Sequence, residues 1–199
     1  MLESKYIALS NLEFANTPFP HFSTTSVFKA GLESNIYNWL EQIDFWEYTK
    51  TNFYTQYEFS LLAAKLPDTL ELLIHEDTIS YIVDRFKQSF NVPALKLVDV
   101  TVHKLLDGHR MGVHNDFLGN IETHRLIIQL NPAWEQKNGG FLMLFNSKYP
   151  EDVAKIVRPL NNTAIGFEIS QKSYHAVSTV YDFCRYTLVY TFTKIEMCC

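Results

Sequence analysis

Residues 95–106 read LKLVDVTVHKLL, a run dominated by apolar and β-branched residues, which is typical of a β-strand. Further short segments of the same kind follow, separated by turn signals such as Asn138-Gly139-Gly140 and Asn161-Asn162. They are RLIIQL (125–130), GFLMLF (140–145), VAKIV (153–157), TAIGFEI (163–169), YHAVSTV (174–180) and CRYTLVYTFT (184–193). This order predicts antiparallel strands that close into a sandwich or barrel.

The residues before 94 carry longer periodic segments that are typical of helices. In the segment 23–46, apolar residues recur at helical spacing behind Ser and Thr residues that can cap a helix. A second helix is predicted between the capping box DTLE (68–71) and Pro93. Its apolar face consists of Ile79, Ile82, Val83, Phe86 and Phe90. We therefore expect a single domain over residues 1–199 that is mainly β with flanking helices (α+β): a mostly helical region at 1–93 and a β core at 94–193.

Composition and charge exclude several classes of protein. Hydrophobic residues make up 47% of the chain and charged residues 20%, as in ordinary soluble globular proteins. The net charge is -5 and basic residues do not cluster, so we expect no nucleic-acid ligand. The first residues do not resemble a signal peptide and no apolar run is long enough to span a membrane, so we expect a cytoplasmic location. Cys184, Cys198 and Cys199 offer neither a disulfide framework nor a CxxC metal knuckle.

The stretch GHRMGVHNDFLGN (108–120) places His114 and Asp116 two residues apart after the first predicted strand. In an extended segment residues i and i+2 point to the same side, so both side chains can reach one metal ion. His175, in a late predicted strand, is the best candidate for a third ligand. Two histidines and one carboxylate leave three positions of the metal open. The alternative is an Asx turn with a solvated imidazole at His114 and a structural, half-buried His175.

Arg185 stands within the apolar run FCRYTLVYTF (183–192). A buried guanidinium needs an anion, and no acidic residue alternates with it on that strand. The anion is either a bound carboxylate or the side chain of a distant acidic residue.

Taken in order, these features resemble a known family. The HxD triplet, RLIIQLN, GGFLMLF, a strand histidine and an arginine ten residues later resemble the iron(II)/2-oxoglutarate dioxygenases, and within them the prolyl 4-hydroxylase-like branch. The resemblance covers about residues 95–193, with PFPHF (18–22) as a weaker match. It implies a double-stranded β-helix, or jelly roll, braced by N-terminal helices that also contact substrate.

The resemblance also implies roles for individual residues. The iron ligands would be His114, Asp116 and His175, and Arg185 would bind the distal carboxylate of 2-oxoglutarate, with Thr187 beside it. Gln129 stands where related prolyl hydroxylases have a tyrosine that bonds the cosubstrate. Arg125 would contact the cosubstrate, bind substrate or pair with Glu122. His103 and His109 are interpreted as loop or outer residues.

The implied reaction uses iron(II), 2-oxoglutarate and O₂, with ascorbate as an assay additive, and releases succinate and CO₂. We expect hydroxylation of an unactivated C–H bond, with desaturation and ring formation as other outcomes of the same chemistry. The expected substrate is an amino-acid-like or natural-product small molecule, and the alternative is a peptidyl residue in a protein or peptide. Two other classes are a non-catalytic jelly-roll binding protein and a metal enzyme of the cupin type.

Overall fold

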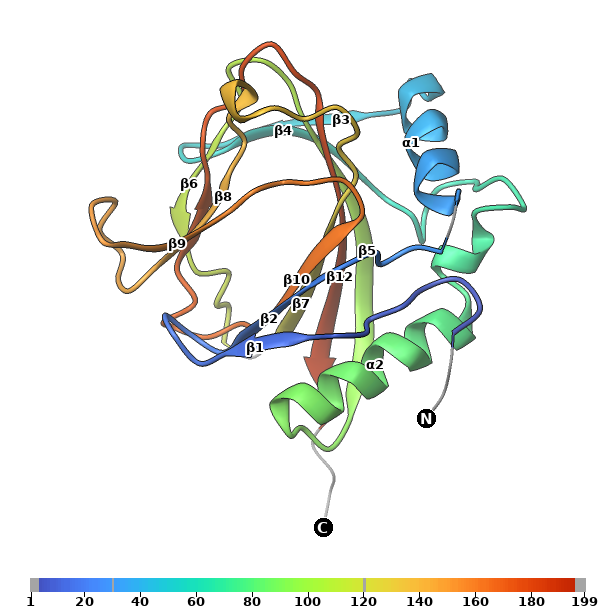
Figure 1. Ribbon diagram of the computed structural model, residues 1–199, viewed down its shortest axis with the longest axis horizontal. Coiled ribbons are helices and arrows are strands. Elements are labelled where there is room, and N and C mark those ends of the chain that lie inside the picture. Colours follow the sequence, from blue (N-terminus) through green and yellow to red (C-terminus); the bar gives the residue numbers. More distant parts are fainter. Residues whose placement is uncertain (1–3, 30, 120, 196–199) are drawn as a thin grey trace.

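Two antiparallel sheets face each other in the computed structural model, which describes residues 4–29, 31–119 and 121–195 (Figure 1). The larger sheet has the strand order β1-β2-β10-β7-β12-β5-β4-β3, and the smaller has the order β6-β11-β8-β9. The strands of the larger sheet are β1 (Glu13–Ala15), β2 (His21–Thr25), β3 (Glu47–Lys50), β4 (Thr55–Ser60), β5 (Leu95–Leu105), β7 (His124–Gln129), β10 (Thr163–Glu168) and β12 (Arg185–Lys194). Those of the smaller sheet are β6 (Met111–His114), β8 (Leu142–Phe145), β9 (Val153–Val157) and β11 (His175–Val177). This arrangement confirms the predicted jelly roll.

Two α-helices, α1 (Leu32–Gln42) and α2 (Glu76–Phe90), lie on the side of the larger sheet that faces away from the smaller one (Figure 1). The α2 helix begins after His75, whose ring accepts a hydrogen bond from the Asp77 amide, and ends at Asn91 in the left-handed conformation. Short 3₁₀ turns occupy Glu71–Leu73 (η1) and Gln136–Asn138 (η2).

The larger sheet separates two apolar clusters. Its outer face packs against the helices, with Ile82 and Phe86 of α2 and Ile36 and Leu40 of α1 fully buried. Its inner face packs against the smaller sheet. The contact is between Ile127, Ile165, Phe167 and Val189 of the larger sheet and Leu142 and Leu144 of the smaller one. Because consecutive strand residues alternate between the faces, each central strand contributes to both clusters.

The strands predicted after residue 94 are all present, with ends that differ by a few residues. The prediction that residues 1–93 are mostly helical is wrong, because this region also contains β1 to β4. The first helix starts only at Leu32, after Gly31 in a left-handed conformation and without a side-chain cap. The predicted capping box at 68–71 instead leads into the 3₁₀ turn η1.

Two further sequence predictions concern the cysteines and membrane-spanning segments. Cys184 is a free, partly buried thiol, whereas Cys198 and Cys199 lie outside the described residues. Within the described part of the chain, no helix is long and apolar enough to cross a membrane.

His124 makes the stability of the fold depend on pH. It begins β7 and is buried against the rings of Phe86 and Phe90. Burial lowers the pKa of this imidazole to about 4, whereas an unfolded histidine has a pKa of about 6.5. The unfolded chain therefore gains a proton between these pH values and the folded chain does not. The contribution of the buried, neutral His124 to the free energy of unfolding is fully present above about pH 6.5. It is lost at roughly 1.4 kcal/mol per pH unit as the pH falls toward 4.

We expect His124→Phe to weaken this pH dependence, because the aromatic cluster keeps a ring but loses the titrating group. Urea unfolding at about pH 7 and about pH 5 should show a change in unfolding free energy that is smaller in the variant by about 2 kcal/mol. Other buried histidines titrate in both proteins and cancel in this comparison. Equal pH dependence in the two proteins would contradict the prediction.

Candidate metal centre and its cavity

Two histidines face each other across neighbouring strands of the smaller sheet. His114 ends β6 and His175 begins β11, and the antiparallel register pairs them directly. Their ring centroids lie 4.2 Å apart. Both side chains are largely buried, with 15% and 4% of their surfaces exposed. The pairing of β6 with β11 therefore brings two imidazoles to one point.

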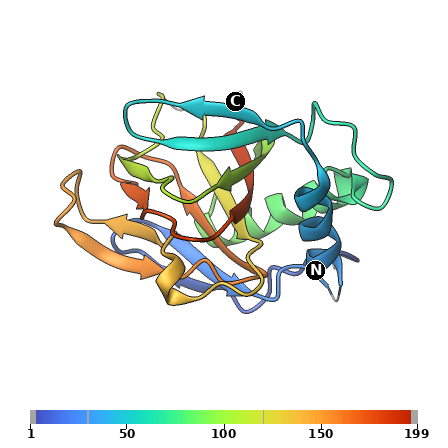
Figure 2. The same cartoon turned by 90° about the horizontal axis from the view of Figure 1, so that it is seen from above.

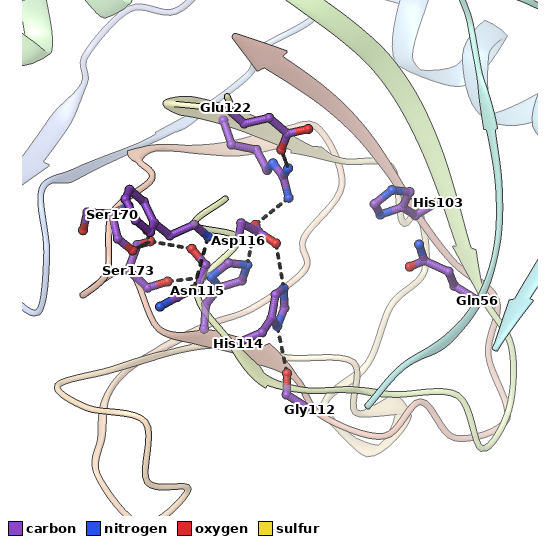
Figure 3. A network of polar contacts seen from close by, with 12 residues as sticks. Gln56, His103, Gly112, His114, Asn115, Asp116, Glu122, Ser170 and Ser173 are labelled. Atoms are coloured by element: carbon purple, nitrogen blue, oxygen red, sulfur yellow. Dashed lines mark hydrogen bonds and ion pairs between the residues drawn. The ribbon is translucent and has the colours of Figure 1, made fainter. Parts of the chain in front are cut away.

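Asp116 joins them from the loop after β6. Its Oδ1 lies 3.2 Å from His114 Nε2, and its Oδ2 lies 3.3 Å from His175 Nε2. The loop is not extended at this point, because Asp116 has a left-handed backbone with φ 58°. An Asx turn holds it there: the Phe117 amide donates to Asn115 Oδ1, and Ser173 Oγ donates to the Asn115 carbonyl. The predicted cluster of side chains is thus present, but an Asx turn creates it rather than strand alternation (Figure 3).

Hydrogen bonds fix the orientation of both imidazoles. His114 Nδ1 lies 2.9 Å from the Gly112 carbonyl and His175 Nδ1 lies 2.8 Å from the Ser173 carbonyl, so each Nδ1 carries the proton. The Nε2 lone pairs then point toward Asp116 and are available to a metal. Ligand atoms of His114, Asp116 and His175 all lie within 4.8 Å of one another. Two neutral imidazoles and one carboxylate form the donor set of non-haem iron(II) oxygenases.

Arg125 keeps the Asp116 carboxylate ionised. Burial alone would raise the pKa of Asp116, but the positive charge of Arg125 holds it well below the ordinary value. Arg125 Nη1 donates to Asp116 Oδ2, and its Nη2 donates to Glu122 Oε2 (Figure 3). Of the three roles open to Arg125, the pair with Glu122 is therefore present. Its contact with a metal-ligand candidate was not foreseen from the sequence.

A cavity of about 230 Å³ extends between the sheets from this cluster. Arg185 lines it from the start of β12 and is 2% exposed. Its Nε donates to the Gly140 carbonyl at 2.9 Å. Gly140 has φ +67°, and a Cβ there would lie 2.8 Å from Arg185 Cδ, so the chain needs glycine at this close approach.

Arg185 has no acidic partner among the ion pairs of the described residues. Burial lowers its pKa to about 10, which leaves it charged at neutral pH. The alternative of a structural ion pair is thus not seen. The guanidinium requires an anion in the cavity, and a carboxylate matches its planar fork.

A row of polar side chains crosses the inner face of the larger sheet beside Arg185. The register places Gln129 opposite Thr187, Thr187 opposite His103, and His103 opposite Glu58. Thr187, His103 and Glu58 line the cavity, whereas Gln129 does not contribute to its lining. Gln129 Nε2 is buried and has no hydrogen-bond partner. It is a donor without an acceptor in the immediate neighbourhood of Arg185.

His103 does not lie in a loop, but it is an outer residue with respect to the metal cluster. It lies on β5 and faces the cavity, two residues before the inward-facing Leu105, so strand alternation could have identified its position. Burial and the charges of Arg125 and Arg185 lower its pKa to about 3, so the ring is neutral. His109 does lie in a loop, where its ring stacks on Tyr57.

Comparisons with known proteins agree with this geometry. Residues 100–192 match the family model described as the 2OG-Fe(II) oxygenase superfamily. A prolyl-4-hydroxylase from Pseudomonas putida has a similar structure, with a TM-score of 0.72 and 13% identity over 88% of this chain and 93% of that chain. A prolyl hydroxylase from Trichoplax adhaerens, in complex with a peptide fragment of a hypoxia inducible factor, gives a TM-score of 0.72 and 14% identity over 87% and 83% of the two chains.

HygX from Streptomyces hygroscopicus, with nickel and 2-oxoglutarate bound, gives a TM-score of 0.61 and 12% identity over 89% of this chain and 84% of that chain. At these identities the solved structures establish the fold. The match of the family model includes all three metal-ligand candidates and Arg185.

We expect His114→Ala and His175→Ala each to weaken binding of cobalt(II) by more than about a hundredfold. Loss of an outer partner of a ligand alone costs about 10–100-fold, and these variants lose the ligand itself. Titration of cobalt(II), followed by its visible absorption, measures the affinity.

His109→Ala is the matched control, because it removes an imidazole from the adjacent loop without touching the cluster. Circular dichroism should be unchanged in all three variants, since strand patterning specifies the fold. Wild-type cobalt(II) affinity in either cluster variant would show that another residue binds the metal.

Proposed function

We propose that this chain, whose residues 100–192 match the 2OG-Fe(II) oxygenase family model, hydroxylates an unactivated C–H bond while 2-oxoglutarate is converted to succinate and CO₂. One observation supports this proposal above all: buried Arg185, which has no acidic partner within the described part of the chain, lines the same cavity as the His114, Asp116 and His175 cluster. One end of this cavity suits a metal and the other suits a carboxylate.

The metal cluster fits iron(II) by its donor set and by the fixed orientation of both imidazoles. His114, Asp116 and His175 would hold the ion, and the three remaining positions would be open to the cosubstrate and O₂. Bound iron(II) supplies the activation of O₂ that C–H hydroxylation requires. Arg125 maintains the charge of the Asp116 ligand, and Gly112 and Ser173 maintain the tautomers of the histidines.

Arg185 would bind the distal carboxylate of 2-oxoglutarate. Thr187, two residues later on the same face of β12, would donate a hydrogen bond from its hydroxyl to the same carboxylate. Gln129, the register partner of Thr187, would be a third donor through its unpartnered Nε2, which lies behind the residues that line the cavity. The unsatisfied donor of Gln129 supports this assignment, because a buried donor without an acceptor is costly unless a ligand supplies one.

The substrate proposed from the sequence is an amino-acid-like or natural-product small molecule. The cavity of about 230 Å³ is smaller than typical ligand sites of about 300–1,000 Å³ and must also hold the cosubstrate. Only one group of side-chain size can therefore enter beside 2-oxoglutarate. A small amino acid meets that limit, and so does a single side chain of a larger molecule.

A peptidyl residue is the second candidate, and an open groove favours it. This groove of about 350 Å³ borders the metal cluster and is lined by Phe53, Phe117, Leu118 and Tyr174. It could hold the neighbours of a residue that inserts its side chain into the cavity. The Trichoplax enzyme, in complex with a peptide fragment, has the same fold.

An aerobic assay tests the proposed function. The protein is incubated with iron(II), ascorbate and 2-oxoglutarate, with panels of amino acids, metabolites and peptides, and is scored for succinate and for substrate mass gain of one oxygen atom. Succinate without a hydroxylated product would still support the oxygenase reaction. If the protein is instead a non-catalytic jelly-roll binding protein, the assay yields neither succinate nor hydroxylated product under any condition.

We expect Arg185→Ala to leave metal affinity nearly unchanged but to weaken 2-oxoglutarate binding by about thirty-fold or more. Loss of a desolvated, bidentate charge pair costs roughly 2–5 kcal/mol. Arg185→Lys should recover only part of this loss, because an ammonium cannot present the planar fork. Anaerobic titration of 2-oxoglutarate into the iron-loaded protein, followed by the metal-to-ligand charge-transfer band, gives the affinity.

Arg110→Ala is the matched control, since Arg110 lies in the loop before β6 and does not line the cavity. Its 2-oxoglutarate affinity should equal that of the wild type. A purely structural role of Arg185 predicts lower thermal stability in both Arg185 variants with unchanged affinity for the cosubstrate, and that result would refute the assignment.

A further inference from the structure

The β3–β4 hairpin forms one wall of the cavity. Its residues Gln56 and Glu58 have no role in the metal cluster or in the proposed contacts to 2-oxoglutarate. The hairpin extends the larger sheet beyond β5 and is seen in teal along one side of the molecule (Figure 2). Its turn also reaches the smaller sheet: the Gly112 amide donates to the Phe53 carbonyl at 2.6 Å, and the Thr55 amide donates to the Arg110 carbonyl. Gln56 and Glu58 of β4 line the cavity opposite the metal cluster.

Glu58 is a carboxylate in this wall without a cationic partner. It accepts hydrogen bonds from Thr49 Oγ1 at 2.6 Å and from Gln56 Nε2 at 2.7 Å, and both donors are neutral. The nearest basic group is His103 Nε2 at 3.8 Å. That ring is neutral because of its burial and the nearby arginines, which lower its pKa to about 3. Glu58 is therefore a carboxylate, 25% exposed, that no lysine or arginine of the described residues contacts.

Gln56 presents a second acceptor that lacks a donor. Its side chain is 3% exposed, and its Nε2 is committed to Glu58. Its Oε1 is buried and has no hydrogen-bond partner. Figure 3 shows Gln56 and His103 reaching into the cavity from the side opposite His114 and Asp116. This wall therefore offers a carboxylate and an unpaired amide oxygen as acceptors.

The charges of the loaded site do not satisfy Glu58 either. Iron(II) brings two positive charges and 2-oxoglutarate brings two negative ones. Arg125 pairs with both Asp116 and Glu122, and the charge of Arg185, which pairs with neither, brings the sum of these four groups to zero. With metal and cosubstrate present, Glu58 remains the one surplus charge of the described cavity and its adjoining ion pairs. A carboxylate in a confined site is stabilised by a cation that reaches it.

Aromatic side chains flank the same wall. Phe53 and Tyr54 line the cavity next to Gln56 and Glu58. Burial and the charge of Glu58 raise the pKa of the Tyr54 phenol, which places that residue within the field of the carboxylate. Aromatic faces beside a carboxylate favour an organic cation through cation–π attraction.

We propose that the substrate enters with a cationic nitrogen, an alkylammonium or guanidinium, whose N–H groups bond the Glu58 carboxylate and Gln56 Oε1. This inference rests on the proposed function and names the class of its substrate. The size of the cavity restricts the entering part to one side-chain-sized chain that ends in the cation. The same chemistry occurs in free basic amino acids or amines and in peptidyl lysine or arginine.

Matched probe pairs test the proposal on the protein loaded with nickel(II) and 2-oxoglutarate, which binds without turnover. Free lysine is compared with norleucine, and free arginine with citrulline. End-capped peptides with the same four residues at the centre form the second arm. Isothermal titration calorimetry should show at least one cationic probe binding about tenfold or more tightly than its neutral partner. The arm that binds decides between a free amino acid and a peptidyl residue.

Glu58→Gln should abolish that preference, because it keeps the shape of the side chain and removes its charge. We expect binding of the preferred cationic probe to weaken by about tenfold or more and binding of its neutral partner to change little. Affinity for 2-oxoglutarate in anaerobic titration should not fall, because the variant removes a negative charge from the cavity that binds this dianion. Glu151→Gln, at an exposed carboxylate between β8 and β9, is the matched control and should preserve the preference.

The two proposals fail in different ways. If neither cationic probe is preferred in either arm, or if Glu58→Gln retains the full preference, the cationic substrate is wrong even though 2-oxoglutarate binds and uncoupled succinate forms. If the wild type neither binds 2-oxoglutarate nor forms succinate, the proposed function itself is wrong.

Discussion

The antiparallel register between β6 and β11 is the constraint on which the site depends. It sets His114 opposite His175, and each imidazole is oriented by the carbonyl two residues before it in the chain, Gly112 or Ser173. A slip of one residue would turn one ring to the other face of the sheet, since side chains alternate along a strand. On its other side β11 pairs with β8, which belongs to the inner apolar cluster. Packing between the sheets thus fixes the position of the histidines.

The third ligand candidate belongs to neither sheet, and an ion pair attaches it to the larger one. Asp116 is positioned by its Asx turn and by Arg125 of β7. The histidines come from the smaller sheet, so the cluster connects both layers of the fold. Glu122 bonds the other arm of Arg125, which fixes the orientation of the guanidinium toward Asp116. The same ion pairs therefore serve the geometry and the electrostatics of the centre.

Strand alternation predicted the β core from the sequence, and the residues that broke this pattern are those that line the cavity. The β4 strand was missed because Gln56 and Glu58 put polar groups on its inner face, where a core strand carries apolar ones. His103 of β5 is likewise a polar residue on the inner face. The proximity of His114 and Asp116 was foreseen, but the left-handed turn at Asp116 follows from local hydrogen bonds that spacing does not reveal. Local rules tend to fail where a sequence serves binding rather than packing.

The two faces of the larger sheet have different roles: the outer face stabilises the fold, and the inner face carries the polar groups of the cavity. Its outer face is apolar and packs on α1 and α2, whereas its inner face carries Gln129, Thr187, His103 and Glu58 in one row. A buried polar atom without a partner costs about 1–3 kcal/mol, so the unpartnered Gln129 Nε2 on this face reduces the stability of the fold. The helical layer offsets this cost through its apolar packing. Ligands that supply the missing partners bind only the folded chain, and occupation of the cavity therefore adds to the stability that the helices provide.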